Sequence, residues 1–267
     1  MMNDLAALRL LVDWGADEAL ADAPVDRFAG RTAPAAASAP TAVSTPTSAP
    51  PAQAQARVPQ PPRGAAAAEQ ARLLADAAAD LAGLHQVLAG FEGCPLRVTA
   101  THTVRPAGTS GTGVVLVAEA PGAEDDRTGL AFSGPPGQLL DRVLADAGLG
   151  RGTMLMTHLV PWRPPGSRAP NEAEVQACLP FLHRLLLLAG ARRLLLLGTG
   201  TVRALAEVAE GPRRLRGRWL PVAIPGAAAP AQALVMPPLE QWMRSAATKR
   251  SVWADLLELR QSIDDAG

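Results

Sequence analysis

Two patterns of apolar and polar residues alternate along residues 65–267: short continuous apolar runs, and segments with apolar residues at helical spacing. Four apolar runs predict buried strands: Val114–Val117, Thr153–Leu159, Arg193–Leu197 and Ala233–Met236. Elsewhere apolar residues recur every three or four positions, which is the spacing of an amphipathic helix. This spacing predicts helices at about residues 66–89, 137–147, 171–188, 201–210 and 248–263. Asn171 is expected to cap the third helix, with Glu172 and Glu174 in its first turn.

Strands that alternate with helices typically form a parallel sheet that is covered by helices on both faces. The sequence therefore predicts a three-layer α/β/α domain with a central, mostly parallel, four-stranded sheet. Ligands of such sheets bind beyond the carboxyl ends of the strands. The segments that follow Val117, Leu159, Leu197 and Met236 are therefore expected to hold the functional residues.

The N-terminal part of the chain has a different pattern. In residues 1–28, Leu5, Leu8, Leu11 and Val12 recur at helical spacing, which predicts a short helical segment. Residues 29–64 are Ala, Pro, Ser, Thr and Gln with almost no large apolar side chains, so burial cannot offset their ordering entropy. We predict a disordered linker there, which tethers residues 1–28 to a domain at 65–267. The first segment is expected to bind a protein partner or the surface of that domain.

Composition excludes several classes of protein. The formal net charge is zero, from 25 Lys and Arg against 25 Asp and Glu, so any basic surface must be local. The two cysteines do not make a disulfide framework. The start of the chain lacks the pattern of a secretory signal, and the longest apolar run, Leu185–Gly190, is too short to cross a bilayer. We expect a soluble, cytoplasmic protein, most simply a monomer, with no membrane partner.

Four loop segments carry recognisable motifs. The first reads Ala-Glu-Ala-Pro-Gly at residues 118–122 and continues through Phe132-Ser133-Gly134 to Gly-Gln-Leu-Leu-Asp at 137–141. The second runs from Thr157 to Arg168, the third reads Leu-Arg-Gly-Arg-Trp at 215–219, and the fourth runs from Met243 to Leu257. In this order and spacing they resemble the iron–sulfur type, called family 4, of the uracil-DNA glycosylase superfamily. The resemblance covers about residues 88–262.

This resemblance implies hydrolysis of the N-glycosidic bond of uracil, or of another deaminated base, in single- or double-stranded DNA. Such a base must be rotated out of the helix into a pocket. By the resemblance, Phe132 provides the stacking face, Glu119 is the acidic catalytic residue, and His158 replaces the Asn that reads the edge of uracil. Ala118, Ala120, Pro121 and Gly122 are expected to complete the base site. The alternatives are a core role for Phe132, an ion pair or helix cap for Glu119, and a histidine satisfied within its loop for His158.

The same resemblance predicts a DNA-binding surface. Its residues are Arg216, Arg218, Trp242, Met243, Arg244, Lys249 and Arg250, beside Arg213 and Arg214. Clustered arginines and lysines favour DNA over a small nucleoside ligand, although charge runs are usually solvated surface. Trp242 and Met243 are interpreted either as wedges into a base stack or as residues that pack against the last helix.

Two departures from the family pattern concern catalysis. The catalytic histidine of the family is replaced by Pro238, or by Met236 if the alignment shifts by two residues, and neither side chain can donate a hydrogen bond. His158 carries its one donor and one acceptor on separate atoms, so it cannot read uracil as an amide does. The sequence therefore predicts reduced or altered excision. A catalytically inactive DNA-binding or accessory protein on the same scaffold is the alternative, and a nucleoside- or nucleotide-binding protein is a third.

A third departure concerns the cofactor. The family holds a [4Fe-4S] cluster with four cysteines, of which this chain keeps Cys94 and Cys178. Phe91 and Trp162 stand at the other two positions. Two thiolates cannot hold a four-iron cluster, which needs one ligand for each iron. We therefore expect Cys94 and Cys178 to be remnant ligands and the protein to carry no cofactor.

Overall fold

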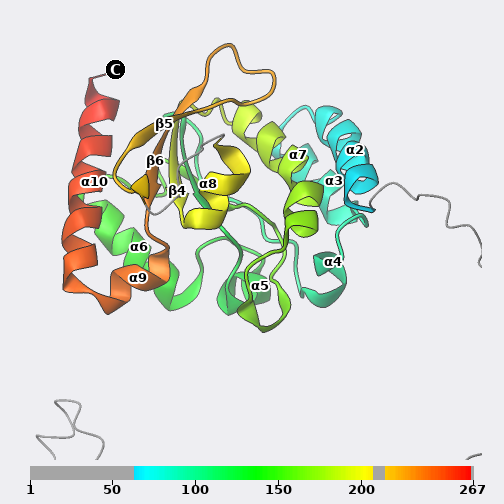
Figure 1. Cartoon of the computed structure of the whole chain (residues 1–267), viewed down its shortest axis with the longest axis horizontal. Coiled ribbons are helices and arrows are strands. Elements are labelled where there is room, and N and C mark those ends of the chain that lie inside the picture. The colour runs from blue at the N-terminus through cyan, green and yellow to red at the C-terminus, as the bar shows by residue number, and fades with distance from the viewer. Residues whose placement is uncertain (1–62, 207–213, 266–267) are drawn as a thin grey trace, which may run out of the picture. The chain divides into compact units, whose positions relative to one another are not determined.

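The structure is a computed structural model, and it describes residues 63–206 and 214–265 (Figure 1). These residues belong to one compact unit. The predicted helical segment at 1–28, the predicted linker up to residue 62, and Arg213 lie outside the described residues. Within the described part of the chain, no helix is both long enough and apolar enough to cross a membrane.

A six-stranded sheet forms the centre of the domain, in the order β1-β3-β2-β4-β6-β5. Its four inner strands are parallel and confirm the predicted sheet: β2 (Val114–Ala118), β3 (Leu155–His158), β4 (Arg193–Leu197) and β6 (Ala231–Met236). Two antiparallel edge strands, β1 (Ala107–Gly108) and β5 (Trp219–Val222), were not predicted. A two-residue strand has no period to detect, and β5 contains Pro221, which edge strands tolerate.

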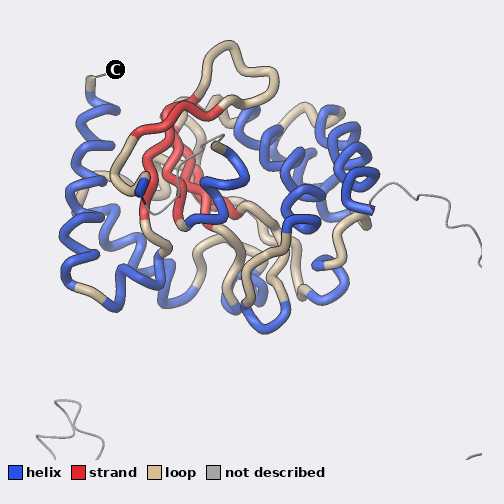
Figure 2. The backbone as a smooth tube through the Cα atoms, viewed as in Figure 1, coloured by secondary structure: helices blue, strands red, loops and turns tan. Residues whose placement is uncertain are grey.

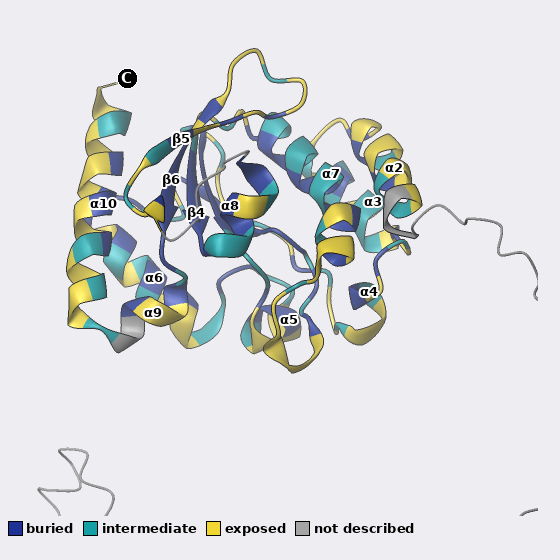
Figure 3. Cartoon of the chain, viewed as in Figure 1, coloured by how far each residue is buried: buried dark blue, intermediate teal, exposed yellow. Residues whose placement is uncertain are grey.

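Helices cover both faces of the sheet, as the sequence predicts (Figures 1 and 2). One face is covered by α2 (Arg63–Asp76), α3 (Leu81–Gly90), α7 (Glu172–Leu188) and α8 (Thr199–Leu205). The other face is covered by α6 (Gly134–Asp146), α9 (Leu239–Arg244) and α10 (Ala246–Asp264). The strands are apolar throughout because neighbouring residues serve opposite layers: Val115 packs with the first set of helices and Leu116 with the second. Figure 3 shows the resulting buried layer between exposed outer helix faces.

Local signals explain where several helices begin and end. The predicted helix at 66–89 is two helices, because Asp80 starts a new one by accepting a hydrogen bond of 2.7 Å from the Gly83 backbone. The predicted start of α7 is confirmed: Asn171 and Glu174 form a reciprocal capping box with bonds of 2.9 and 2.8 Å. Among the short elements, α4 (Leu96–Thr99) precedes β1, whereas α5 (Ala123–Thr128) and a 3-10 turn at Pro165–Ser167 follow β2 and β3.

Candidate active site

The loops that follow β2, β3 and β6 enclose a cavity of about 620 Å³ at the carboxyl edge of the sheet. This volume is within the usual range for small-ligand sites. The residues that the sequence assigns to base binding and catalysis all line it: Ala118, Glu119, Ala120, Pro121, Gly122, Phe132, His158 and Pro238. Asp125, Ser133, Arg168 and Leu239 also contribute to the wall. The fold therefore brings together residues from Ala118 to Glu240, which are far apart in the chain.

Two aromatic rings from different loops stack in this wall. The ring of Phe132, which precedes α6, lies against the imidazole of His158 at the end of β3. Their centroids are 4.8 Å apart and their planes differ by 17°. Phe132 is only 5% exposed and His158 only 7% exposed. The pair joins two loops of the cavity through a stacked contact.

The backbone of Phe132 is held in an unusual conformation. Its φ is +55°, in the left-handed region that is sparsely populated by residues other than glycine. Arg151 donates a hydrogen bond of 2.6 Å to its carbonyl oxygen and also pairs with Asp141 on α6. A Cβ on Gly137 would lie 1.8 Å from the same oxygen, so only glycine fits there. These contacts hold the backbone conformation from which the Phe132 side chain projects.

Asp125 connects three parts of the site, and sequence reasoning did not single it out. Its carboxylate accepts hydrogen bonds from the backbone of Gly122 at 2.9 Å and of Ser133 at 2.6 Å. The same carboxylate lies 3.5 Å from Nε2 of His158. Asp125 therefore fixes the loop after β2 and the residue next to Phe132, and its carboxylate also lies close to the imidazole ring.

His158 is a neutral base in this environment. Burial lowers the pKa of His158 to about 4, and the nearby Asp125 carboxylate only partly opposes this effect. A neutral imidazole has one N–H donor and one acceptor nitrogen. Because the carboxylate of Asp125 accepts hydrogen bonds, it favours the tautomer with the proton on Nε2.

Glu119 lies in the cavity wall and also caps a helix. Its Oε1 accepts a hydrogen bond of 2.5 Å from the backbone of Gly200, in the first turn of α8. A Cβ on Gly200 would lie 2.8 Å from the Glu119 carboxyl carbon, so the glycine makes room for this side chain. The helix-cap role and the position in the site therefore coexist.

Pro238 and Met236, the two candidate positions for the family's catalytic histidine, lie in different surroundings. Pro238 lines the cavity as the N-cap of α9. Met236 is 2% exposed and packs in the core between the sheet, α6 and α10. The side chain that faces the cavity at this point is therefore a proline ring, which donates no hydrogen bond.

Comparison with known proteins agrees with this geometry. Residues 106–257, more than half of the chain, match the sequence profile of the uracil-DNA glycosylase superfamily. The chain belongs to that superfamily. It is similar to type-4 uracil-DNA glycosylases, with 40% identity over 129 residues to that of Pyrobaculum aerophilum and 39% over 89 residues to that of Thermotoga maritima. These matches span 48% and 33% of this chain, and 66% and 46% of the relatives' own lengths.

The residues assigned to the superfamily's DNA surface divide into two groups. Arg216, Arg218, Lys249 and Arg250 are exposed, on the turn before β5 and the first turns of α10. Trp242 is 1% exposed, and its indole donates a hydrogen bond of 3.0 Å to the Pro237 carbonyl oxygen. Trp242 therefore packs in the core and presents no ring to DNA. The side chains of Met243 and Arg244 lie outside the described ones.

The four positions of the superfamily's type-4 cluster meet in one buried core. Cys94, Cys178, Phe91 and Trp162 are each 1% exposed. Phe91 makes an edge contact with Phe181, and the indole of Trp162 donates a hydrogen bond of 2.9 Å to Thr103. Two buried aromatic rings therefore stand at two of the positions that the resemblance assigns to cluster ligands. In the described chain, no group of three or more His, Cys, Asp or Glu side chains could hold a metal ion.

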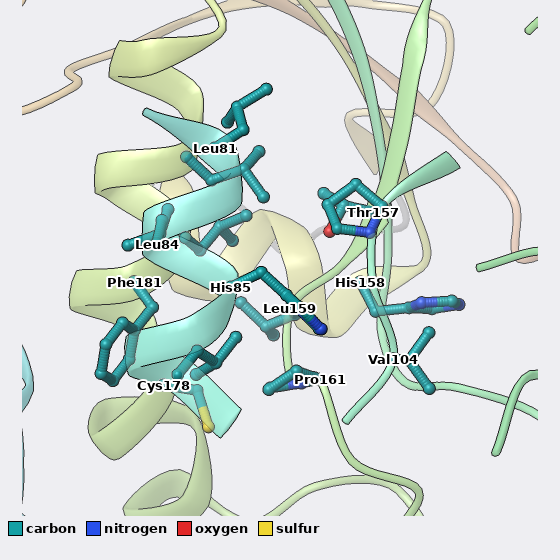
Figure 4. A pocket seen from close by; sticks show the side chains of 14 residues that line it. Leu81, Leu84, His85, Val104, Thr157, His158, Leu159, Pro161, Cys178 and Phe181 are labelled. Atoms are coloured by element: carbon teal, nitrogen blue, oxygen red, sulfur yellow. The ribbon is translucent and has the colours of Figure 1, made fainter. Parts of the chain in front are cut away.

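The two cysteines form a thiol pair. A hydrogen bond between them lowers the pKa of Cys94, whereas the same contact and burial raise the pKa of Cys178. The pair thus loses a first proton more readily than a second. Figure 4 shows Cys178 beside a cavity of about 40 Å³ that is lined mostly by apolar side chains such as Leu84. This donor set does not fit a four-iron cluster.

Proposed function

We propose that this chain is a base-excision protein, which hydrolyses the N-glycosidic bond of uracil or another deaminated base in DNA with reduced or altered activity. The observation that carries the proposal is the single cavity in which Glu119, Phe132 and His158 meet at the carboxyl edge of the sheet. That edge is where α/β folds bind their ligands. Superfamily membership and the names of the type-4 relatives support the reaction class.

The residues of the cavity suit parts of this reaction. Cleavage leaves positive charge on the sugar and negative charge on the departing base, so a carboxylate and aimed donors stabilise its transition state. Glu119 supplies the carboxylate: one of its oxygens is held by Gly200, and it keeps further lone pairs for a water or for the sugar. The backbone from Ala120 to Gly122 also lines the cavity, but the Gly122 N–H is bonded to Asp125 and Pro121 has no N–H to donate.

Pro238 is the reason for expecting slow excision. A donor at this point of the wall would face the charge that develops on the leaving base, and the proline ring has none. Removal of one such donor typically costs a factor of ~10²–10³ in rate. His158 adds a second loss, because its neutral ring lacks the paired donor and acceptor of an amide.

The test is an excision assay on uracil-containing single strands and duplexes. The parent protein is compared with the double variant His158→Asn with Pro238→His, and with Pro238→Ala as the control for removing the proline ring. We expect slow excision by the parent, faster excision by the double variant, and no gain from Pro238→Ala. A parent that excises as fast as an intact type-4 enzyme would show that the site is rebuilt and not degraded.

An inactive DNA-binding or accessory protein is the second candidate. It is favoured by the deep burial of Phe132, whose ring is almost fully covered. A double variant that is folded, binds DNA and still excises nothing would support this candidate over the first.

DNA is the proposed partner in both cases, through Arg216, Arg218, Lys249 and Arg250. We expect weak, salt-sensitive and largely sequence-independent binding. Lys249→Glu with Arg250→Glu should lower affinity for all sequences and reduce the salt slope by about 2. The control is Arg72→Glu on α2. Arg72 is exposed and forms an ion pair with Glu69 in the parent protein. Equal losses in both variants would place the contact surface elsewhere.

We also propose that the protein works without an iron–sulfur cluster, because Phe91 and Trp162 fill two ligand positions with buried rings. Stoichiometric iron after anaerobic purification would contradict this. A protein partner for residues 1–28, a monomeric state and a cytoplasmic location stay predictions from the sequence.

A further inference from the structure

The ring on which a flipped base would stack is already covered. Phe132 is 5% exposed, so neither face of its ring is open to a ligand. Within the described chain, the aromatic ring that lies on it is the imidazole of His158, at 4.8 Å and 17°. This separation and near-parallel angle are those of stacked aromatic rings, and a base on an aromatic side chain stacks in the same way.

The direction of the His158 side chain fits this reading. His158 borders both cavities, and Figure 4 shows its ring pointing away from α3. On its other side His158 is part of the wall of the large cavity, together with Glu119 and Pro238. An imidazole is flat and compact, so it can take the place of a base against Phe132.

The imidazole is also held in this place. Asp125 lies 3.5 Å from its Nε2, and two backbone hydrogen bonds from Gly122 and Ser133 fix that carboxylate. The ring remains neutral in ordinary buffers because burial lowers the pKa of His158 to about 4. A neutral ring costs much less solvation free energy on burial in this wall than a charged imidazolium would.

We propose that the imidazole of His158 occupies the place of the flipped base against Phe132, so that a base enters the pocket only by displacing it. The inference rests on the proposed function in one respect, namely that this cavity is the base site. It assigns His158 the role of a built-in occupant that competes with the substrate. A base must therefore out-compete the imidazole for Phe132 before Glu119 can act on its glycosidic bond.

The first test observes the imidazole directly. The chain has four histidines, so the ring protons of His158 can be assigned in NMR spectra from the signals that His158→Ala removes. A ring stacked on Phe132 should give signals shifted upfield by the aromatic ring current. We expect Phe132→Leu to move them back toward ordinary positions. Unshifted His158 signals in the parent protein would overturn the proposal.

The second test measures binding of free uracil to the full-length protein. His158→Ala uncovers the ring of Phe132, whereas His158→Phe keeps an aromatic ring in the same place and is the matched control. Stacked pairs are typically worth a factor of roughly two to ten in affinity, so His158→Ala should bind uracil at least that much more tightly than the parent. His158→Phe should show no gain.

Equal uracil binding by the parent and by folded His158→Ala would overturn the proposal. His158→Val, which has neither an aromatic ring nor an amide that could read uracil, serves the same purpose if the alanine variant does not fold. Neither measurement depends on catalysis. A protein that never excises uracil would refute the proposed enzymatic function, while the NMR shift and the uracil affinities would still decide the role of His158.

Discussion

His158 shows how one residue couples the site to the stability of the domain. Its side chain is 4% exposed, and burial lowers its pKa to about 4. The unfolded chain takes up a proton near the ordinary value of about 6.5, while the folded protein takes it up only near 4. The stabilising contribution of the neutral ring is therefore complete above pH 6.5 and is lost as the pH falls toward 4.

We predict that acid destabilises the parent protein more than the His158→Asn variant, in which this position cannot titrate. The difference in the free energy of unfolding should change by about 2–3 kcal/mol between pH 7 and pH 4. Urea unfolding at several pH values measures it. Parallel pH profiles for the two proteins would show that His158 is not the buried neutral group described.

Asp255 on α10 also makes the stability of the domain depend on pH, but it destabilises the domain as the pH rises. It is 8% exposed, and its Oδ2 is buried without a hydrogen-bond partner among the residues that the structure describes. Burial raises the pKa of Asp255 to about 6, although Arg216 nearby favours the charged form. The folded protein therefore holds this proton at pH values at which the unfolded chain has released it. Its stability falls as the pH rises from about 4 to 6, and the cost persists above 6.

We predict that Asp255→Asn stabilises the domain at pH 7.5 by about 1–3 kcal/mol and has little effect at pH 4. Asp264→Asn on the same helix is the control, because Asp264 is exposed in an ion pair with Arg260. Thermal unfolding at the two pH values compares the variants. A loss of stability in Asp255→Asn at pH 7.5 would mean that the carboxylate has a favourable charged partner.

For single residues, the sequence predicts where the site lies better than it predicts the hydrogen bonds that hold the site together. Glu119, Phe132 and His158 could be predicted because they follow strands or stand in a family motif. Asp125 could not, because it is the middle acid of a Glu-Asp-Asp run that resembles the solvated first turn of a helix. Only the fold turns Asp125 and Asp126 inward, where they bind backbone groups of other loops.

At the scale of single elements, α8 depends on a residue from another loop. The first turn of this short helix has no cap of its own, and Glu119 accepts a hydrogen bond from Gly200 in its place. Glu119 therefore has both positions that the sequence analysis considered for it: it caps a helix and it lines the cavity. Variants can separate the two roles because glutamine keeps the acceptor oxygen and removes the charge.

We predict that Glu119→Ala lowers the free energy of unfolding by about 1 kcal/mol, the usual loss for an N-terminal cap, and that Glu119→Gln lowers it much less. If Glu119 also serves catalysis, both variants lose excision, although only the alanine variant loses stability. Urea unfolding and the excision assay together measure this. Normal excision by a stable Glu119→Gln would restrict Glu119 to its structural role.

The prediction of helices and strands is wrong where a local feature, such as one capping residue, lies within a longer apolar pattern. Apolar spacing runs almost unbroken through residues 66–89, so it hides the break at which Asp80 starts α3. The inner strands are continuous apolar runs and were predictable, whereas β5 is an edge strand with the pattern Trp-Leu-Pro-Val and a half-exposed first residue. Edge strands and helix breaks depend on their neighbours in space, which a period along the chain does not contain.

At the scale of the whole molecule, α2 is the first described helix and contributes to the core of the domain. This helix packs along α7, and its buried Ala71 and Ala75 belong to the same core cluster as Cys178 and Trp162. The domain predicted from residue 65 therefore needs essentially all of α2, which begins at Arg63. The linker composition of residues 29–64 gives no reason for the preceding chain to contribute to this core.

We predict that a fragment of residues 63–267 unfolds at the temperature of the full chain, and that a fragment of residues 81–267 is strongly destabilised. The second truncation removes α2 and exposes apolar surface of α7 and α3, and losses of this kind usually cost several kcal/mol. Thermal unfolding of the three proteins compares them, and limited proteolysis of the full chain should leave a fragment that begins near residue 63. A lower unfolding temperature for 63–267 than for the full chain would show that the N-terminal segment stabilises the domain, and would point to the domain surface as the partner of residues 1–28.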